Sequence, residues 1–64
     1  MNYDYFILQN YTFRFDTDAN GWHELFVFDS DRNFWKVLDS TSNKEDLKEI
    51  AEDWLEAIKH NPHA

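Results

Sequence analysis

The last third of the chain carries an apolar pattern that fits one structure, an amphipathic α-helix. Between residues 42 and 60, apolar residues recur at spacings of three and four, which places them on a single stripe of the helix. That stripe consists of Leu47, Ile50, Ala51, Trp54, Leu55, Ala57 and Ile58. A helix of this length spans about 27 Å and can cover one face of a small sheet. The rest of the chain is therefore expected to supply that sheet.

The residues at both ends of this stretch predict where the helix begins and ends. Ser42 is followed three residues later by Glu45, the spacing of a capping box. Pro62 cannot continue a helix, so the helix should end near His60. Residues 61–64 are expected to form a flexible C-terminal tail.

Length and composition predict one folded domain, residues 1–64, with little core. A domain of this size buries only about 60% of the surface of its unfolded chain, and the sequence has no cysteine for a stabilising disulfide. Twelve of the 64 residues are aromatic, far more than a disordered acidic segment contains. We therefore expect stability to come from aromatic packing and from self-association.

The first 41 residues read as four strands separated by polar turns. Residues 3–8 and 11–15 form one predicted hairpin around Gln9 and Asn10, with Leu8 opposite Tyr11. Residues 22–28 and 34–38 form a second hairpin after a turn that contains the only glycine, Gly21. The predicted fold class is α+β, ββββα: a four-stranded antiparallel sheet of two hairpins with one C-terminal amphipathic helix packed on one face.

The second hairpin is apolar on both faces, although one helix can cover only one of them. We expect the helix to cover Leu25, Val27, Trp35 and Val37. The opposite, uncovered face would then carry a protein interface formed by Phe26, Phe28, Phe34 and Leu38. A homodimer is one expected use of that face, and the alternative is that strand twist and the tyrosines of the first strand cover it.

A row of carboxylates follows the side of the predicted helix opposite its apolar stripe. The candidate partner-binding residues are Glu45, Glu49, Glu52, Asp53 and Glu56. Glutamates four residues apart repel each other by a few tenths of a kcal/mol, so helix stability does not account for the row. It could occupy a basic nucleic-acid-binding cleft as a mimic of phosphates, or it could simply keep the domain soluble.

Two further patterns suggest metal chemistry and are incomplete. Asp16, Asp18, Asn20 and Gly21 match the start of an EF-hand calcium loop, but its twelfth position is Val27 instead of glutamate. A weak calcium site is thus an alternative to an ordinary polar turn.

The three histidines, His23, His60 and His63, are too few and too dispersed for a closed zinc site. His23 and Glu24 should point to opposite faces of a strand, so they form no catalytic dyad. We predict no metal, no cofactor and no enzymatic activity.

The net charge narrows the range of partners. Thirteen acidic and six basic residues give −7, which argues against direct binding to nucleic acid or to an anionic membrane and favours a basic protein surface. No segment reads as a signal peptide, and the longest apolar run has four residues, so a cytoplasmic location is expected.

The function expected from these features is a non-catalytic inhibitor or interaction module that engages a basic, nucleic-acid-binding site through the acidic helix face. Small acidic phage proteins that block host nucleic-acid-handling or defence machinery fit this physical description. The alternatives are an accessory or structural subunit that assembles through the aromatic sheet face, and a weak calcium-binding domain.

Overall fold

The structure, a computed structural model, describes residues 2–60, with side chains from residue 4 onward. It contains four strands, β1 (Asn2–Leu8), β2 (Tyr11–Thr17), β3 (His23–Asp29) and β4 (Phe34–Thr41), and one helix, α1 (Asp46–His60). The predicted flexible tail, residues 61–64, lies outside the described residues.

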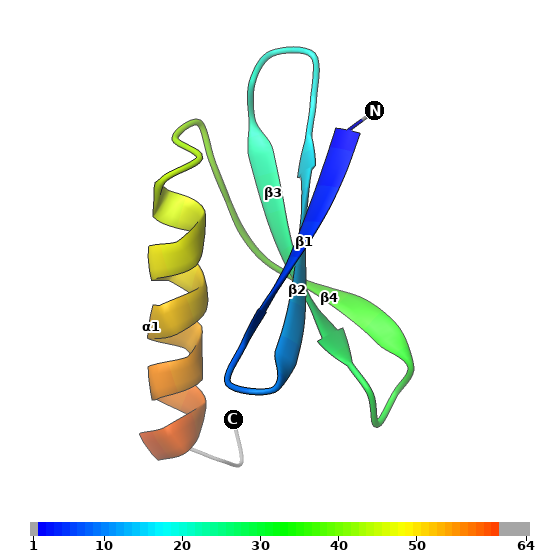
Figure 1. Cartoon of the computed structure of the whole chain (residues 1–64), viewed down its shortest axis with the longest axis vertical. Coiled ribbons are helices and arrows are strands. Elements are labelled where there is room, and N and C mark those ends of the chain that lie inside the picture. The colour runs from blue at the N-terminus through cyan, green and yellow to red at the C-terminus, as the bar shows by residue number, and fades with distance from the viewer. Residues whose placement is uncertain (1, 61–64) are drawn as a thin grey trace.

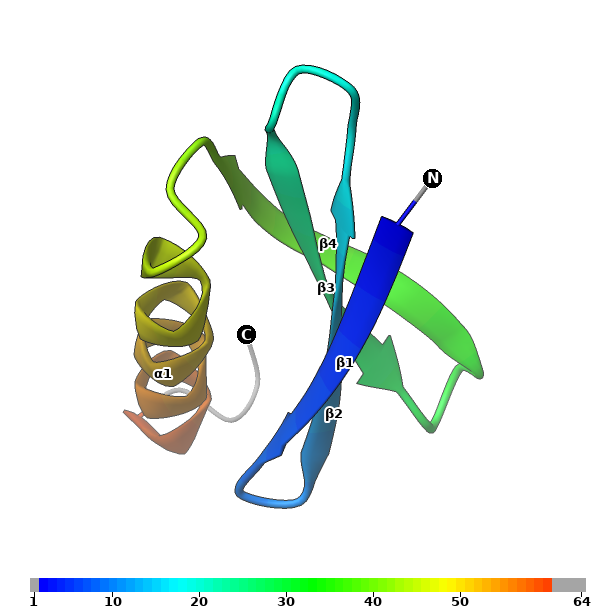
Figure 2. The ribbon, with the colours of Figure 1, turned by 45° about the horizontal axis from the view of Figure 1, so that its top comes forward.

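The strands form one open antiparallel sheet in the order β1-β2-β3-β4, and α1 packs against one side of it (Figure 1). The ribbon turned by 45° shows the strong twist of the sheet, with β4 crossing behind β1 and β2 (Figure 2). The predicted α+β, ββββα fold class is therefore confirmed.

The first hairpin has the predicted register. Leu8 pairs with Tyr11 and Phe6 with Phe13. The two turn residues, Gln9 and Asn10, have φ angles of 49° and 71°. Positive φ at both central positions is the geometry of the two-residue turns that match strand twist, and it forms here without glycine.

The core lies between the sheet and α1. Its buried side chains come from three elements, β2, β3 and α1: Phe13, Phe15, Leu25, Val27, Leu47, Ala51 and Leu55. Ile50, Trp54 and Ile58 pack partly buried around these residues. The prediction that α1 covers Leu25 and Val27 is thus confirmed, whereas Ala57, assigned to the apolar stripe, is exposed.

The helix begins later than predicted, and a different residue caps it. α1 starts at Asp46, and Asn43 rather than Ser42 provides the acceptor: its Oδ1 accepts a hydrogen bond of 3.1 Å from the N–H of Glu45. Thr41 Oγ1 in turn accepts from the N–H of Asn43 at 3.1 Å. The predicted Ser42–Glu45 capping box is wrong because β4 continues to Thr41 and the turn that follows it places Asn43 at the cap.

The second hairpin differs from the prediction in which side chains face α1. The four-residue turn between β3 and β4 pairs Asp29 with Phe34 and Phe28 with Trp35. Partners across a sheet share a face, so Trp35 lies on the side of Phe28, away from α1. Val37 pairs with Phe26 on that same side and is 54% exposed. The prediction that Trp35 and Val37 lie under the helix is therefore wrong.

The same pairing moves two residues of the predicted aromatic interface. Pairing shifts by one residue between Leu25, opposite Asp39, and Phe26, opposite Val37, which leaves Leu38 as the extra residue of a β-bulge. Leu38 packs against the core. Phe34 alternates with Trp35 along β4 and so lies on the other side of the strand. Phe26 and Phe28 remain on the uncovered face, but Leu38 and Phe34 do not.

Candidate protein-binding surfaces

The side of the sheet opposite α1 is apolar and is not covered by the helix; it is here called the open face. Phe26, Phe28 and Trp35 are half-buried on it by neighbouring side chains. Cross-strand pairs of Tyr5 with Arg14, Arg14 with Phe26, and Phe26 with Val37 bring all four strands into it. Its apolar members are Tyr5, Ile7, Phe26, Phe28, Trp35 and Val37. Tyr5 is 56% exposed and Ile7 70%. Exposed apolar residues gathered on one sheet face mark an interaction surface.

Arg14 lies at the centre of the open face and ties its rings together. Its guanidinium is 4.5 Å from the ring centroid of Phe26 and 4.9 Å from that of Trp35. Trp35 in turn contacts the rings of Tyr5, at 5.9 Å between centroids, and Phe28, at 5.2 Å. These contacts hold the side chains of the open face in one arrangement before any partner binds.

The charge of Arg14 is compensated from within the same strand. Its Nε lies 3.1 Å from Oδ1 of Asp16, and both atoms are buried from solvent. Its Nη2 also donates to Oδ2 of Asp16 at 3.4 Å. The centre of the open face therefore combines aromatic rings with a cation that already has its counter-ion.

The acidic row faces solvent as predicted; Glu45 directly precedes α1, and the other four residues belong to the helix. Its five members are exposed: Glu45, Glu49, Glu52, Asp53 and Glu56. Glu56 Oε1 lies 2.8 Å from Nε2 of His60, one helical turn away. The remaining four carboxylates have no basic side chain in the hydrogen bonds or ion pairs identified among residues 2–60. They are accessible to a positively charged partner.

The structure adds a residue from the sheet to this acidic surface. A shallow groove of about 330 Å³ runs between β4 and α1, and its carboxylates are Asp39, Asp46, Glu49 and Asp53. Asp39 belongs to β4 and was missed by sequence reasoning, because the bulge at Leu38 that turns Asp39 toward the helix has no sequence signal of its own. Of the described residues, none that lines the groove is basic.

Two lysines, Lys44 and Lys48, lie on the flank of α1 opposite this groove. Lys44 and Lys48 border the opposite side of α1, next to Phe6 and Phe15. The Lys44 ammonium is 5.5 Å from the ring centroid of Phe15. Asp46, Glu49 and Asp53 thus lie on the flank of the helix next to β4, and Lys44 and Lys48 lie on the opposite flank.

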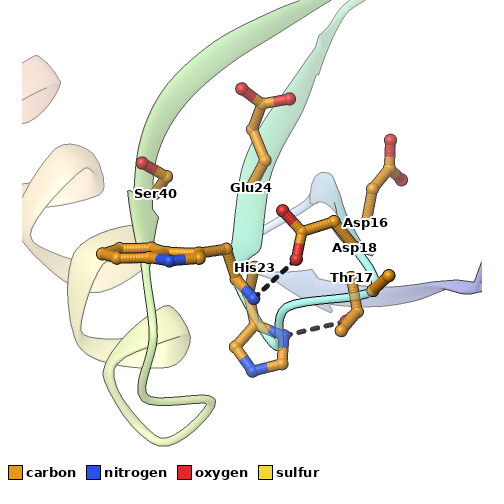
Figure 3. A pocket seen from close by; sticks show the side chains of 8 residues that line it. Asp16, Thr17, Asp18, His23, Glu24 and Ser40 are labelled. Atoms are coloured by element: carbon orange, nitrogen blue, oxygen red, sulfur yellow. Dashed lines mark hydrogen bonds between the residues drawn. The ribbon is translucent and has the colours of Figure 1, made fainter.

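A second pocket, of about 530 Å³, lies at the turn between β2 and β3 (Figure 3). Here Asp18 Oδ1 accepts hydrogen bonds of 2.9 Å from the N–H groups of both Asn20 and Trp22. Gly21 has a φ of 84°, which the turn requires. Asp18 thus orders the turn, and Asp16 pairs with Arg14.

These partners give the calcium-loop residues a structural role. Among the described residues, no group of three or more His, Asp or Glu side chains is placed to hold a metal ion. His23 Nδ1 is hydrogen-bonded to Thr17 Oγ1 at 2.8 Å. His63 lies outside the described residues.

No protein-family model, no curated protein and no solved structure matches this chain. Within the described residues, no helix is both long enough and apolar enough to span a membrane. What defines the protein is its ββββα fold with an acidic surface on the helix side and an apolar surface on the opposite side.

Proposed function

We propose that this protein is a small, acidic, non-catalytic protein-binding module that engages a basic, nucleic-acid-binding site of a partner protein and thereby inhibits it. The observation that carries the proposal is the acidic surface formed by the helix row and the groove beside β4. Four carboxylates line that groove, and none of its described lining residues is basic. The proposal includes a cytoplasmic location, where such partners act.

The arrangement of these carboxylates supports binding to a site built for phosphates. Residues four apart on a helix are neighbours at roughly 5–6 Å, which is comparable to, and somewhat shorter than, the spacing of phosphates along a nucleic-acid strand. A net charge of −7 also accelerates encounter with a basic surface. Small acidic phage inhibitors of host nucleic-acid-handling or defence machinery are the kind of protein that this surface suits.

Charge reversal on the acidic surface tests the proposal. The immobilised protein should capture a basic partner from host cells, and raising the salt concentration should release it. Glu49→Lys with Glu52→Lys should weaken this complex at least tenfold. The matched control is Asp4→Lys with Asp31→Lys, which changes the net charge equally at exposed positions outside the acidic row and the groove beside β4 and should retain most of the affinity.

A competition measurement tests the inhibitory step. The captured partner should bind nucleic acid, and added protein should displace that nucleic acid in proportion to its concentration. Simultaneous binding of both, or equal loss of affinity in the two double variants, would contradict recognition by the helix surface.

The open face favours a second candidate function, an accessory subunit that assembles through its sheet. On this alternative the carboxylates only solubilise the domain. Val37→Glu should then abolish capture of the partner, and charge reversal at Glu49 and Glu52 should leave it unchanged.

A further inference from the structure

We infer that the open face is covered by a second copy of this chain, in a two-fold symmetric dimer in which two sheets pack face to face. This inference is independent of the proposed function, because it concerns the opposite side of the molecule from the acidic surface. The exposure, the charge and the size of the open face favour a second copy of the chain as its occupant.

The protomer buries only a few of the aromatic side chains of the described residues in its own core. Phe13 and Phe15 are the only aromatic residues of the described part that are buried. By contrast, Ile7, Tyr5 and Val37 on the open face are each more than half exposed. Each protomer would bury these side chains by pairing its open face with another, at about 25 cal/mol per Å² of apolar surface.

The distribution of charge favours a second copy over an unrelated partner. Two chains of net charge −7 repel each other wherever their carboxylates meet. The centre of the open face escapes this repulsion, because Asp16 compensates the charge of Arg14 there. A second carboxylate of this face, Glu24, lies opposite Asp16 toward one end. A centre without net charge offers nothing that selects a strongly acidic or basic partner, and it fits against the equivalent centre of a second copy.

The composition of the open face also matches a homodimer interface. The central part of such interfaces is enriched in aromatic residues and arginine and is depleted of lysine and glutamate. Here Arg14 lies among Phe26 and Trp35 at the centre, and Lys36, which pairs with Val27, is on the other side of β4. Glu24 lies toward one end of the face, outside this central part. In a dimer with a two-fold axis, the same patch of both subunits forms the interface.

The size of the molecule is consistent with this use. Its principal extents are 35 × 22 × 17 Å, so a contact that covers one side has an area of the same order as the about 800 Å² per partner of a standard interface. Two such sheets would pack about 10 Å apart. The helix α1 of each protomer would lie on the outside, so the dimer would display two acidic surfaces.

Solution mass is the test. Wild-type protein at micromolar to millimolar concentration should have twice the 7.8 kDa mass of the chain by sedimentation or light scattering. Val37→Glu and Ile7→Glu should each raise the dimer dissociation constant at least a hundredfold and yield monomers. The matched control is Phe34→Glu, which places the same charge at an exposed apolar position of β4 on the other side of the strand and should remain dimeric.

A wild-type chain that is monomeric throughout this range would overturn the proposed dimer. A dimer that Phe34→Glu dissociates while Val37→Glu does not would also overturn it. Circular dichroism of each variant establishes that it is folded. If Val37→Glu does not fold, Val37→Thr tests the same contact with an expected tenfold weakening. Charge reversal at Glu49 and Glu52 should leave the dimer intact, which separates this result from the proposed partner binding.

Discussion

The two faces of the sheet carry similar apolar residues, but α1 covers one face and leaves the other accessible to solvent. On the covered face Phe13 and Leu25 are completely inaccessible, whereas on the open face Val37 and Ile7 are more than half exposed. The covered face is completed by the apolar stripe of α1. On the open face, the described side chains contact one another through ring contacts and the ion pair between Arg14 and Asp16, and α1 does not cover them.

This difference shows that apolar content alone does not identify a core in a very small domain. A single helix can complete one sheet face, and the remaining apolar residues are available for binding. Adjacent residues of one strand illustrate this. Leu25 and Val27 of β3 are buried in the core, and Phe26 between them belongs to the open face.

Truncation of a side chain on the covered face should cause the largest loss of unfolding free energy. Phe13→Ala removes a fully buried ring and should cost about 3–5 kcal/mol of unfolding free energy, enough to unfold a domain of this size. Urea denaturation followed by circular dichroism measures this cost. Val37→Ala, at a protein concentration below that of dimerisation, should cost less than about 1 kcal/mol. Similar losses for the two variants would contradict the division between the faces.

Removal of the central cation should have an intermediate effect. Arg14→Met loses two cation–π contacts and the ion pair with Asp16, and it leaves Asp16 directly opposite Glu24. We expect a loss of about 1–2 kcal/mol in thermal or urea unfolding. Arg32→Met, at an exposed turn position, is the control and should change stability by less than about 0.5 kcal/mol.

The turn between β1 and β2 joins the two strands whose pairing places Phe6 and Phe13 on the covered face. Substitutions in this turn should change the free energy of unfolding by about 1 kcal/mol. Gln9 has a positive φ of 49°, which costs a residue with a side chain about 1 kcal/mol or more. Gln9→Gly should therefore stabilise the protein by about 0.5–1 kcal/mol. Gln9→Val should destabilise it, because a branched side chain is strained at this φ. Equal thermal unfolding midpoints for the two variants would contradict the cost assigned to the positive φ at Gln9.

The smallest expected effect concerns calcium. Asp18 is committed to the turn and Asp16 to Arg14, so millimolar calcium should shift the thermal midpoint by no more than magnesium does. A rise that is specific to calcium and saturates with its concentration would restore the calcium-binding alternative.

Much of this fold follows from local sequence patterns. The alternation in residues 11–15 and the spacing of Leu47, Ala51 and Leu55 predict the elements of the covered face, because each pattern depends only on the geometry of one strand or helix. The five carboxylates of the acidic row were identified in the same way. The role of that row in binding stays a prediction.

The errors arose where one element depends on another. Trp35 and Val37 were assigned to the covered face because the pairing of β4 with β3 depends on the turn between them, which periodicity does not specify. The bulge at Leu38 then turns Leu38 and Asp39 toward α1. Asn43 replaced Ser42 at the helix cap for a related reason, since the length of β4 determines which polar residue reaches that position.

Hydroxyl-radical footprinting of the wild-type protein across a range of concentrations tests the division between the faces most directly. Phe13 and Phe15 should be protected from oxidation at every concentration at which the chain is folded. Tyr5 and Trp35 should be oxidised in dilute solution and become protected as the concentration rises, with the midpoint of the dimerisation measured by solution mass. Equal oxidation of Tyr5 and Trp35 at all concentrations would contradict the account of the open face as an interface between two copies of this chain.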